Sequence, residues 1–99
     1  MPTTDNDAEM LRTMANAITD LQVKYRAASL DDQAILATPL TELLRDYGNY
    51  QARLLKAGTI TDDGELAEMA AIRQSITDNA TRQDLLLAIA RITALIASA

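Results

Sequence analysis

Apolar side chains recur along the first 57 residues at alternating steps of three and four. The first series is Leu11, Met14, Ile18, Leu21, Tyr25 and Ala28. The second series is Leu36, Leu40, Leu43, Tyr47, Tyr50, Leu54 and Ala57. Residues at these steps share one narrow side of an α-helix, which is typical of a helix packed against another helix. The pattern therefore predicts an all-α fold: a small antiparallel helical bundle or hairpin of three long helices with coiled-coil-like packing.

The first series predicts a helix over about residues 5–28. An acidic residue, Asp5 or Asp7, precedes the apolar positions and can cap the start of this helix. Residues 1–4 are expected to form a flexible tail. Residues 1–99 are expected to fold as a single helical domain, because about 100 residues is a common size for one folding unit.

Two capping signals compete for the start of the second helix. Thr38 followed by Pro39 predicts a helix over about residues 39–57, because threonine caps well and proline suits the first helical position. Ser29 and the acidic residues that follow it resemble a second capping box. The apolar spacing also continues across Pro39, so one helix over residues 30–57 with a kink at the proline is the alternative.

The last third of the chain carries two separate apolar stripes. The first is Leu66, Met69, Ile72 and Ile76, and the second is Leu85, Ile89, Ile92 and Ile96. The nine residues from Ile76 to Leu85 turn a helix by about 900°, so the two stripes lie half a turn apart. No glycine or proline interrupts them, which favours one helix over residues 63–98. A capping pattern that starts at Thr81 leaves open a break near 77–81 and a fourth helix.

The first two helices are expected to form an antiparallel hairpin, in which Tyr47 lies across from Ile18 or Leu21. Tyr47, Gly48 and Tyr50 form a secondary candidate patch for partner binding. Glycine inside a helix costs about 1 kcal/mol relative to alanine, and close approach of another backbone would explain why it is there.

The C-terminal helix is apolar nearly all round, and a bundle of this size is expected to cover only part of it. The remainder predicts a contact with a partner protein or with another copy of the chain. The candidate interface residues are Leu86, Leu87, Ile89, Leu95 and Ile96. The alternative is a central helix that the rest of the same chain covers.

Charge and composition exclude several functional classes. Fourteen acidic residues against nine basic ones give a net charge of -5, so no nucleic-acid partner is expected. The most apolar stretch, residues 85–99, contains Arg91 and is shorter than the roughly 20 residues that span a bilayer, so no membrane span is expected. Cysteine is absent and the first residues are polar, which favours a cytoplasmic or virion protein without a signal peptide.

The sequence contains no histidine and no glycine-rich phosphate loop, so no catalytic residue, cofactor or metal site is predicted. The expected function is a non-enzymatic protein–protein interaction or assembly protein, as a homo-oligomer or in a hetero-complex. One alternative is an acidic regulator that mimics nucleic acid and inhibits a partner. Another is a small helical enzyme of about the size of a chorismate mutase, in which Arg53, Arg73 and Arg91 converge on an anionic ligand.

Overall fold

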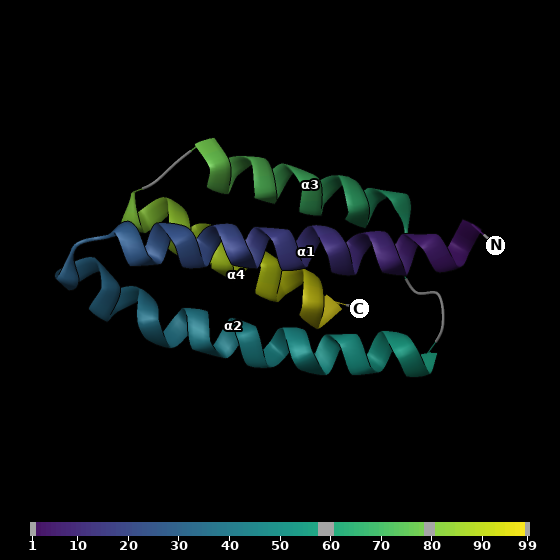
Figure 1. Cartoon of the computed structure of the whole chain (residues 1–99). Coiled ribbons are helices and arrows are strands. Elements are labelled where there is room, and N and C mark those ends of the chain that lie inside the picture. The colour runs from purple at the N-terminus through teal and green to yellow at the C-terminus, as the bar shows by residue number, and fades with distance from the viewer. Residues whose placement is uncertain (1, 58–60, 79–80, 99) are drawn as a thin grey trace.

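The computed structural model describes the backbone of residues 2–57, 61–78 and 81–98, which form four helices and no strand (Figure 1). In chain order the helices are α1 (Pro2–Ala27), α2 (Leu30–Ala57), α3 (Asp63–Asp78) and α4 (Arg82–Ser98). The predicted all-α bundle is confirmed.

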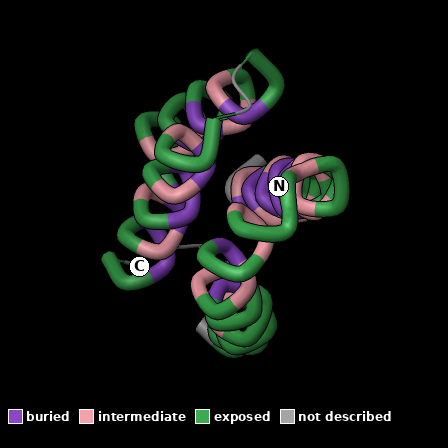
Figure 2. The backbone as a smooth tube through the Cα atoms, turned by 90° about the vertical axis from the view of Figure 1, so that its left-hand side faces the viewer, coloured by how far each residue is buried: buried purple, intermediate pink, exposed green. Residues whose placement is uncertain are grey.

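Each helix packs mainly against two others around a shared core. α1 and α4 both contact α2 on one side and α3 on the other (Figure 1). Buried positions face the interior of the bundle and exposed positions face outwards on every helix (Figure 2). The largest fully buried side chains are aliphatic: Met10, Met14, Leu21, Leu36, Leu43, Met69, Ile72, Ile76, Leu85 and Ile92.

The first and third helices begin in different ways. Residues 2–4 belong to α1 and do not form the predicted tail. Proline is favoured in the first turn of a helix, which suits Pro2 at this position. Met1 lies outside the described residues. α3 begins with a capping box, in which the Asp62 N–H donates to Glu65 Oε1 (3.0 Å) and the Glu65 N–H donates to Asp62 Oδ1 (2.7 Å).

α2 continues through Pro39, so the separate start at the proline is wrong and the alternative of one helix is confirmed. Ser29 caps this helix, because its Oγ accepts a hydrogen bond from the Asp32 N–H (3.2 Å). An internal proline costs a helix about 3 kcal/mol. Leu36 and Leu40 on either side of it are both buried, and this packing offsets the cost. The first part of α2 is inclined to the rest (Figure 1).

Only two residues separate α1 from α2, so residues equally far from this turn lie opposite each other. The Tyr47 hydroxyl accordingly donates a hydrogen bond to the carbonyl oxygen of Leu11 (3.1 Å). The predicted position of Tyr47 across from Ile18 or Leu21 is wrong, because it assumed that α2 begins nine residues later than its observed start at Leu30.

α3 and α4 are two helices, and the continuous helix over residues 63–98 is wrong. Thr81 caps α4, since its Oγ1 accepts a hydrogen bond from the Asp84 N–H (3.2 Å). The chain reverses direction between the two helices (Figure 1). Their stripes lie half a turn apart, and this reversal turns both stripes towards the same core.

Most of the apolar surface of α4 lies inside the bundle. Ile89 is only 5% exposed, and Leu95 and Ile96 are also buried, whereas Leu86 is half-buried and Leu87 is 57% exposed. Ile89, Leu95 and Ile96 are therefore core residues of the chain itself and not the partner-contact residues expected from the sequence. The physical reason is that α4 lies between α2 and α3, which cover it.

We expect Ile89→Asp to unfold the chain or to lower its melting temperature by at least about 15 °C, because the substitution places an unpaired charge in the core. Differential scanning calorimetry of the purified variant measures this shift. Leu87→Asp, on the exposed side of the same helix, is the matched control and should melt within a few degrees of the wild type. Equal melting of the wild type and Ile89→Asp would contradict the central position of α4.

Candidate interaction surface

The three residues of the predicted patch on α2 have different environments. Tyr50 is buried in the core, and Tyr47 is half-buried with its hydroxyl bonded to α1. Gly48 is exposed, and a Cβ built on it would meet no atom within 4 Å. Packing inside the chain therefore does not explain the glycine, and Gly48 alone of the three is fully open to a partner.

Tyr50 belongs to a polar cluster at the end of the bundle where α2 finishes. The Thr61 N–H donates a hydrogen bond to Oδ1 of Asp7 (3.0 Å), and both residues are buried. The Arg53 guanidinium lies over the Tyr50 ring, 5.6 Å from its centre, and donates a hydrogen bond to the carbonyl oxygen of Ile96 (2.8 Å). The cluster thus joins α1, α2, α4 and the segment that leads into α3.

Burial raises the pKa of the Tyr50 hydroxyl above its ordinary value. The nearby Thr61 side chain lowers this pKa by less than burial raises it. The carboxylates of Glu65 and Asp7 raise the pKa further, and the Arg53 charge lowers it slightly. The hydroxyl therefore stays protonated at neutral pH.

Two of the three arginines expected to converge on an anionic ligand engage different partners. Arg53 binds the last turn of α4, whereas Arg73 Nε on α3 lies 3.3 Å from Asp20 Oδ2 on α1. In the described ranges, no three or more His, Cys, Asp or Glu side chains come together in a way that could hold a metal ion.

A second heptad series runs along the outside of α2. We call it the outer stripe, and its residues are Leu30, Ala34, Ala37, Thr41, Leu44, Gly48, Gln51 and Leu55. From Ala37 onward each member directly follows a residue of the predicted apolar series. All members are exposed except Ala37, which is half-buried. Leu30 is 82% exposed, Leu44 41% and Leu55 85%, so three leucines of one stripe face solvent.

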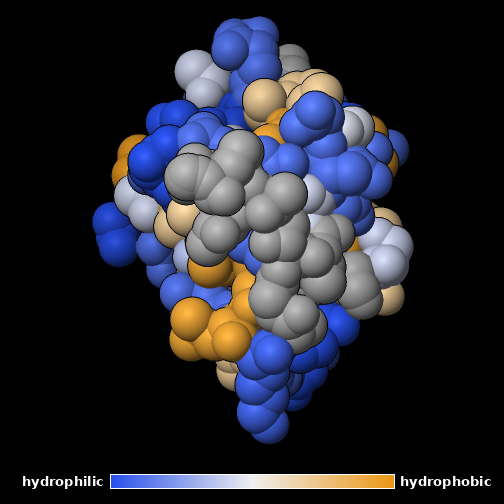
Figure 3. Space-filling model, turned by 90° about the vertical axis from the view of Figure 1, so that its right-hand side faces the viewer, coloured by the Kyte–Doolittle hydropathy of each residue, from blue (hydrophilic) through white to orange (hydrophobic). Residues whose placement is uncertain are grey.

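A groove against α1 borders the middle of the outer stripe. This open groove of about 230 Å³ separates the middle section from α1, which contributes Gln22, Tyr25 and Arg26 to the lining. At the end of the molecule where α2 finishes, an apolar patch reaches the surface (Figure 3). The outer stripe holds three of the six large hydrophobic residues that are exposed among the described residues.

None of the described helices is both long enough and apolar enough to cross a membrane. Comparisons of the chain with protein families, with curated proteins and with solved structures found no match.

Sequence reasoning missed the outer stripe because most of its members are small or polar. The signal that could have revealed it is the absence of charge from every one of its positions. α2 carries seven charged residues: Asp31, Asp32, Glu42, Arg45, Asp46, Arg53 and Lys56. All seven lie off the outer stripe, which is typical of a helix face that contacts another helix.

We expect the chain to lose stability above about pH 10 and Tyr50→Phe to reduce this loss. The folded state raises the pKa of Tyr50 above the ordinary value of 10.0, so the unfolded chain releases this proton first. The contribution of Tyr50 to the free energy of unfolding is fully present below pH 10.0. It is lost as the pH rises through the higher pKa of Tyr50 in the folded chain.

Urea unfolding at several pH values from about 8 to about 11 measures the free energy of unfolding of both proteins. Tyr25→Phe, outside the polar cluster, serves as the control for general effects of losing a hydroxyl group. Parallel curves for the wild type and Tyr50→Phe would show that the burial argument is wrong.

Proposed function

We propose that this chain is a non-enzymatic protein–protein interaction or assembly protein and that the outer stripe of α2 is its contact surface. The observation that carries the proposal is the exposed, uncharged heptad series along a helix of 28 residues. Paired helices use this spacing. A partner helix can also cover such a stripe without burying an unpaired charge.

The leucines of the outer stripe supply the energy of contact. Full burial of one leucine side chain contributes roughly 1.5–3 kcal/mol. Leu30 and Leu55 have most of their surface in water, and Leu44 lies between them near the middle of the helix. Burying all three offsets a substantial part of the entropic cost of association.

The small members of the outer stripe favour a helix as the partner. Ala34, Ala37, Thr41 and Gly48 leave shallow positions between the leucines, so the backbone of a second helix can approach α2 closely. α4 offers a rival surface at Leu86 and Leu87, where an open hollow of about 480 Å³ is bordered by the polar side chains of Arg82 and Gln83.

We expect Leu44→Glu to weaken association at least about tenfold, because it places a charge at the centre of the contact and removes an apolar side chain. Sedimentation equilibrium over a wide concentration range measures self-association. Retention of cell proteins on the immobilised chain, compared between the wild type and the variant, measures association with other proteins.

Leu87→Glu is the matched control, because it introduces the same charge at another exposed leucine. The outer stripe is supported if Leu44→Glu loses association and Leu87→Glu keeps it. The opposite result would move the contact surface to α4. The proposed function itself is overturned if the wild type shows neither concentration-dependent mass nor any retained protein that Leu44→Glu loses.

A further inference from the structure

We propose that the partner of the outer stripe is a second copy of this chain, whose α2 packs antiparallel to the first across a twofold axis. This inference rests on the proposed function and names its partner. It follows from the order of large, small and charged residues along α2, which is complementary to itself when one copy is reversed.

Antiparallel pairing of the outer stripe places leucine opposite leucine at both ends and never sets two large side chains together elsewhere. In this register Leu30 meets the partner's Leu55, Ala34 meets the partner's Gln51, Ala37 meets the partner's Gly48, and Thr41 meets the partner's Leu44. The twofold axis repeats each pair. The most exposed leucines meet at the two ends, and no charged residue lies in any layer.

Gly48 gains a role in this arrangement. It costs α2 about 1 kcal/mol relative to alanine, yet no side chain of the described residues lies within 4 Å of a Cβ built on it. Gly48 lies opposite the partner's Ala37, and this pair has the smallest combined side-chain volume of any layer. The two backbones can therefore approach most closely there. The same position explains why Gly48 is exposed in the single chain.

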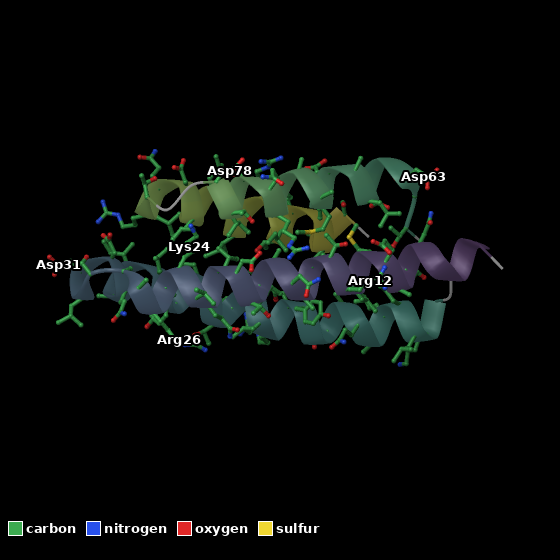
Figure 4. The ribbon with its side chains drawn as sticks, turned by 45° about the horizontal axis from the view of Figure 1, so that its top comes forward. Arg12, Lys24, Arg26, Asp31, Asp63 and Asp78 are labelled. Carbon is green, nitrogen blue, oxygen red and sulfur yellow. The ribbon has the colours of Figure 1, made fainter. Side chains whose placement is uncertain are left out.

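The charges beside the outer stripe favour the antiparallel direction. Asp31 lies near the N-terminal end of α2 and Lys56 near its C-terminal end, and Figure 4 shows Asp31 at the opposite end of the molecule from Asp63. Reversal brings Asp31 next to the partner's Lys56, and Glu42 next to the partner's Arg45. Asp31, Glu42 and Lys56 make no ion pair with any described residue, so all three are available.

A parallel arrangement would instead leave these charges without opposite partners. Asp31 and the partner's Lys56 would lie at opposite ends of the paired helices, and Glu42 and the partner's Arg45 would lie on opposite sides of the contact. The antiparallel arrangement also aligns the two helix dipoles favourably. Charge complementarity therefore commits the outer stripe to a reversed copy of itself.

Cysteine cross-linking tests the direction directly, because the chain has no native cysteine. Ala37→Cys and Gly48→Cys are made as two separate variants with tags of different mass. Each is treated with a short bismaleimide cross-linker alone, and then both are treated as a mixture. Residues 37 and 48 lie about 16 Å apart along one helix, whereas facing residues of packed helices lie about 8–10 Å apart.

We expect the mixture to give a cross-linked dimer that contains one chain of each variant, at least about fivefold faster than either variant alone. Equal cross-linking of each variant alone would indicate parallel pairing and overturn the proposal. Failure of the mixture to cross-link, at a concentration where the wild type sediments as a dimer, would also overturn it. In both cases loss of association in Leu44→Glu would still support the proposed function.

Charge reversal gives an independent test. We expect Asp31→Lys to weaken dimerisation about two- to fivefold at low salt, because it faces the partner's Lys56 with a like charge. The double variant Asp31→Lys with Lys56→Asp should recover the wild-type dissociation constant, measured by sedimentation equilibrium. No recovery in the double variant would contradict the assigned register.

Discussion

Burial of aliphatic side chains in one core shared by all four helices is the constraint on which the rest of this structure depends. The chain has no Phe, Trp or Cys, so no disulfide can hold the helices together and tyrosine is the only aromatic residue type that can enter the core. Each helix must contribute its own row of aliphatic residues to the centre. The constraint also sets the directions of the last two helices: the apolar rows of α3 and α4 reach the same core because the two helices run in opposite directions (Figure 1).

Spacing and capping chemistry predicted the fold class and most of the core. Ser29, Asp62 and Thr81 cap helices as their local sequences imply, because capping depends on a few neighbouring atoms. Pro39 was misleading, since its local preference for a helix start was outweighed by the burial of Leu36 and Leu40 around it. That one error also displaced the predicted neighbours of Tyr47, because the position where α2 begins sets its pairing with α1.

The contact surface could be predicted less well, because exposure is a property of the assembled chain. α4 has apolar residues on nearly every side, which in sequence indicates a need for a partner. In the structure α2 and α3 provide most of that cover, and Ile89 and Ile96 lie in the core. The outer stripe of α2 was overlooked for the opposite reason: its small residues carry little hydrophobic signal, and only their exposure beside three leucines reveals the pattern.

The distribution of tyrosine gives the molecule an internal optical label. Tyr25, Tyr47 and Tyr50 all lie on α1 and α2, and no tryptophan is present. Intrinsic fluorescence of the folded chain therefore originates from one helix pair, whereas far-ultraviolet circular dichroism receives signal from all four helices. A difference between the two signals along an unfolding curve would identify which pair of helices loosens first, without any added dye.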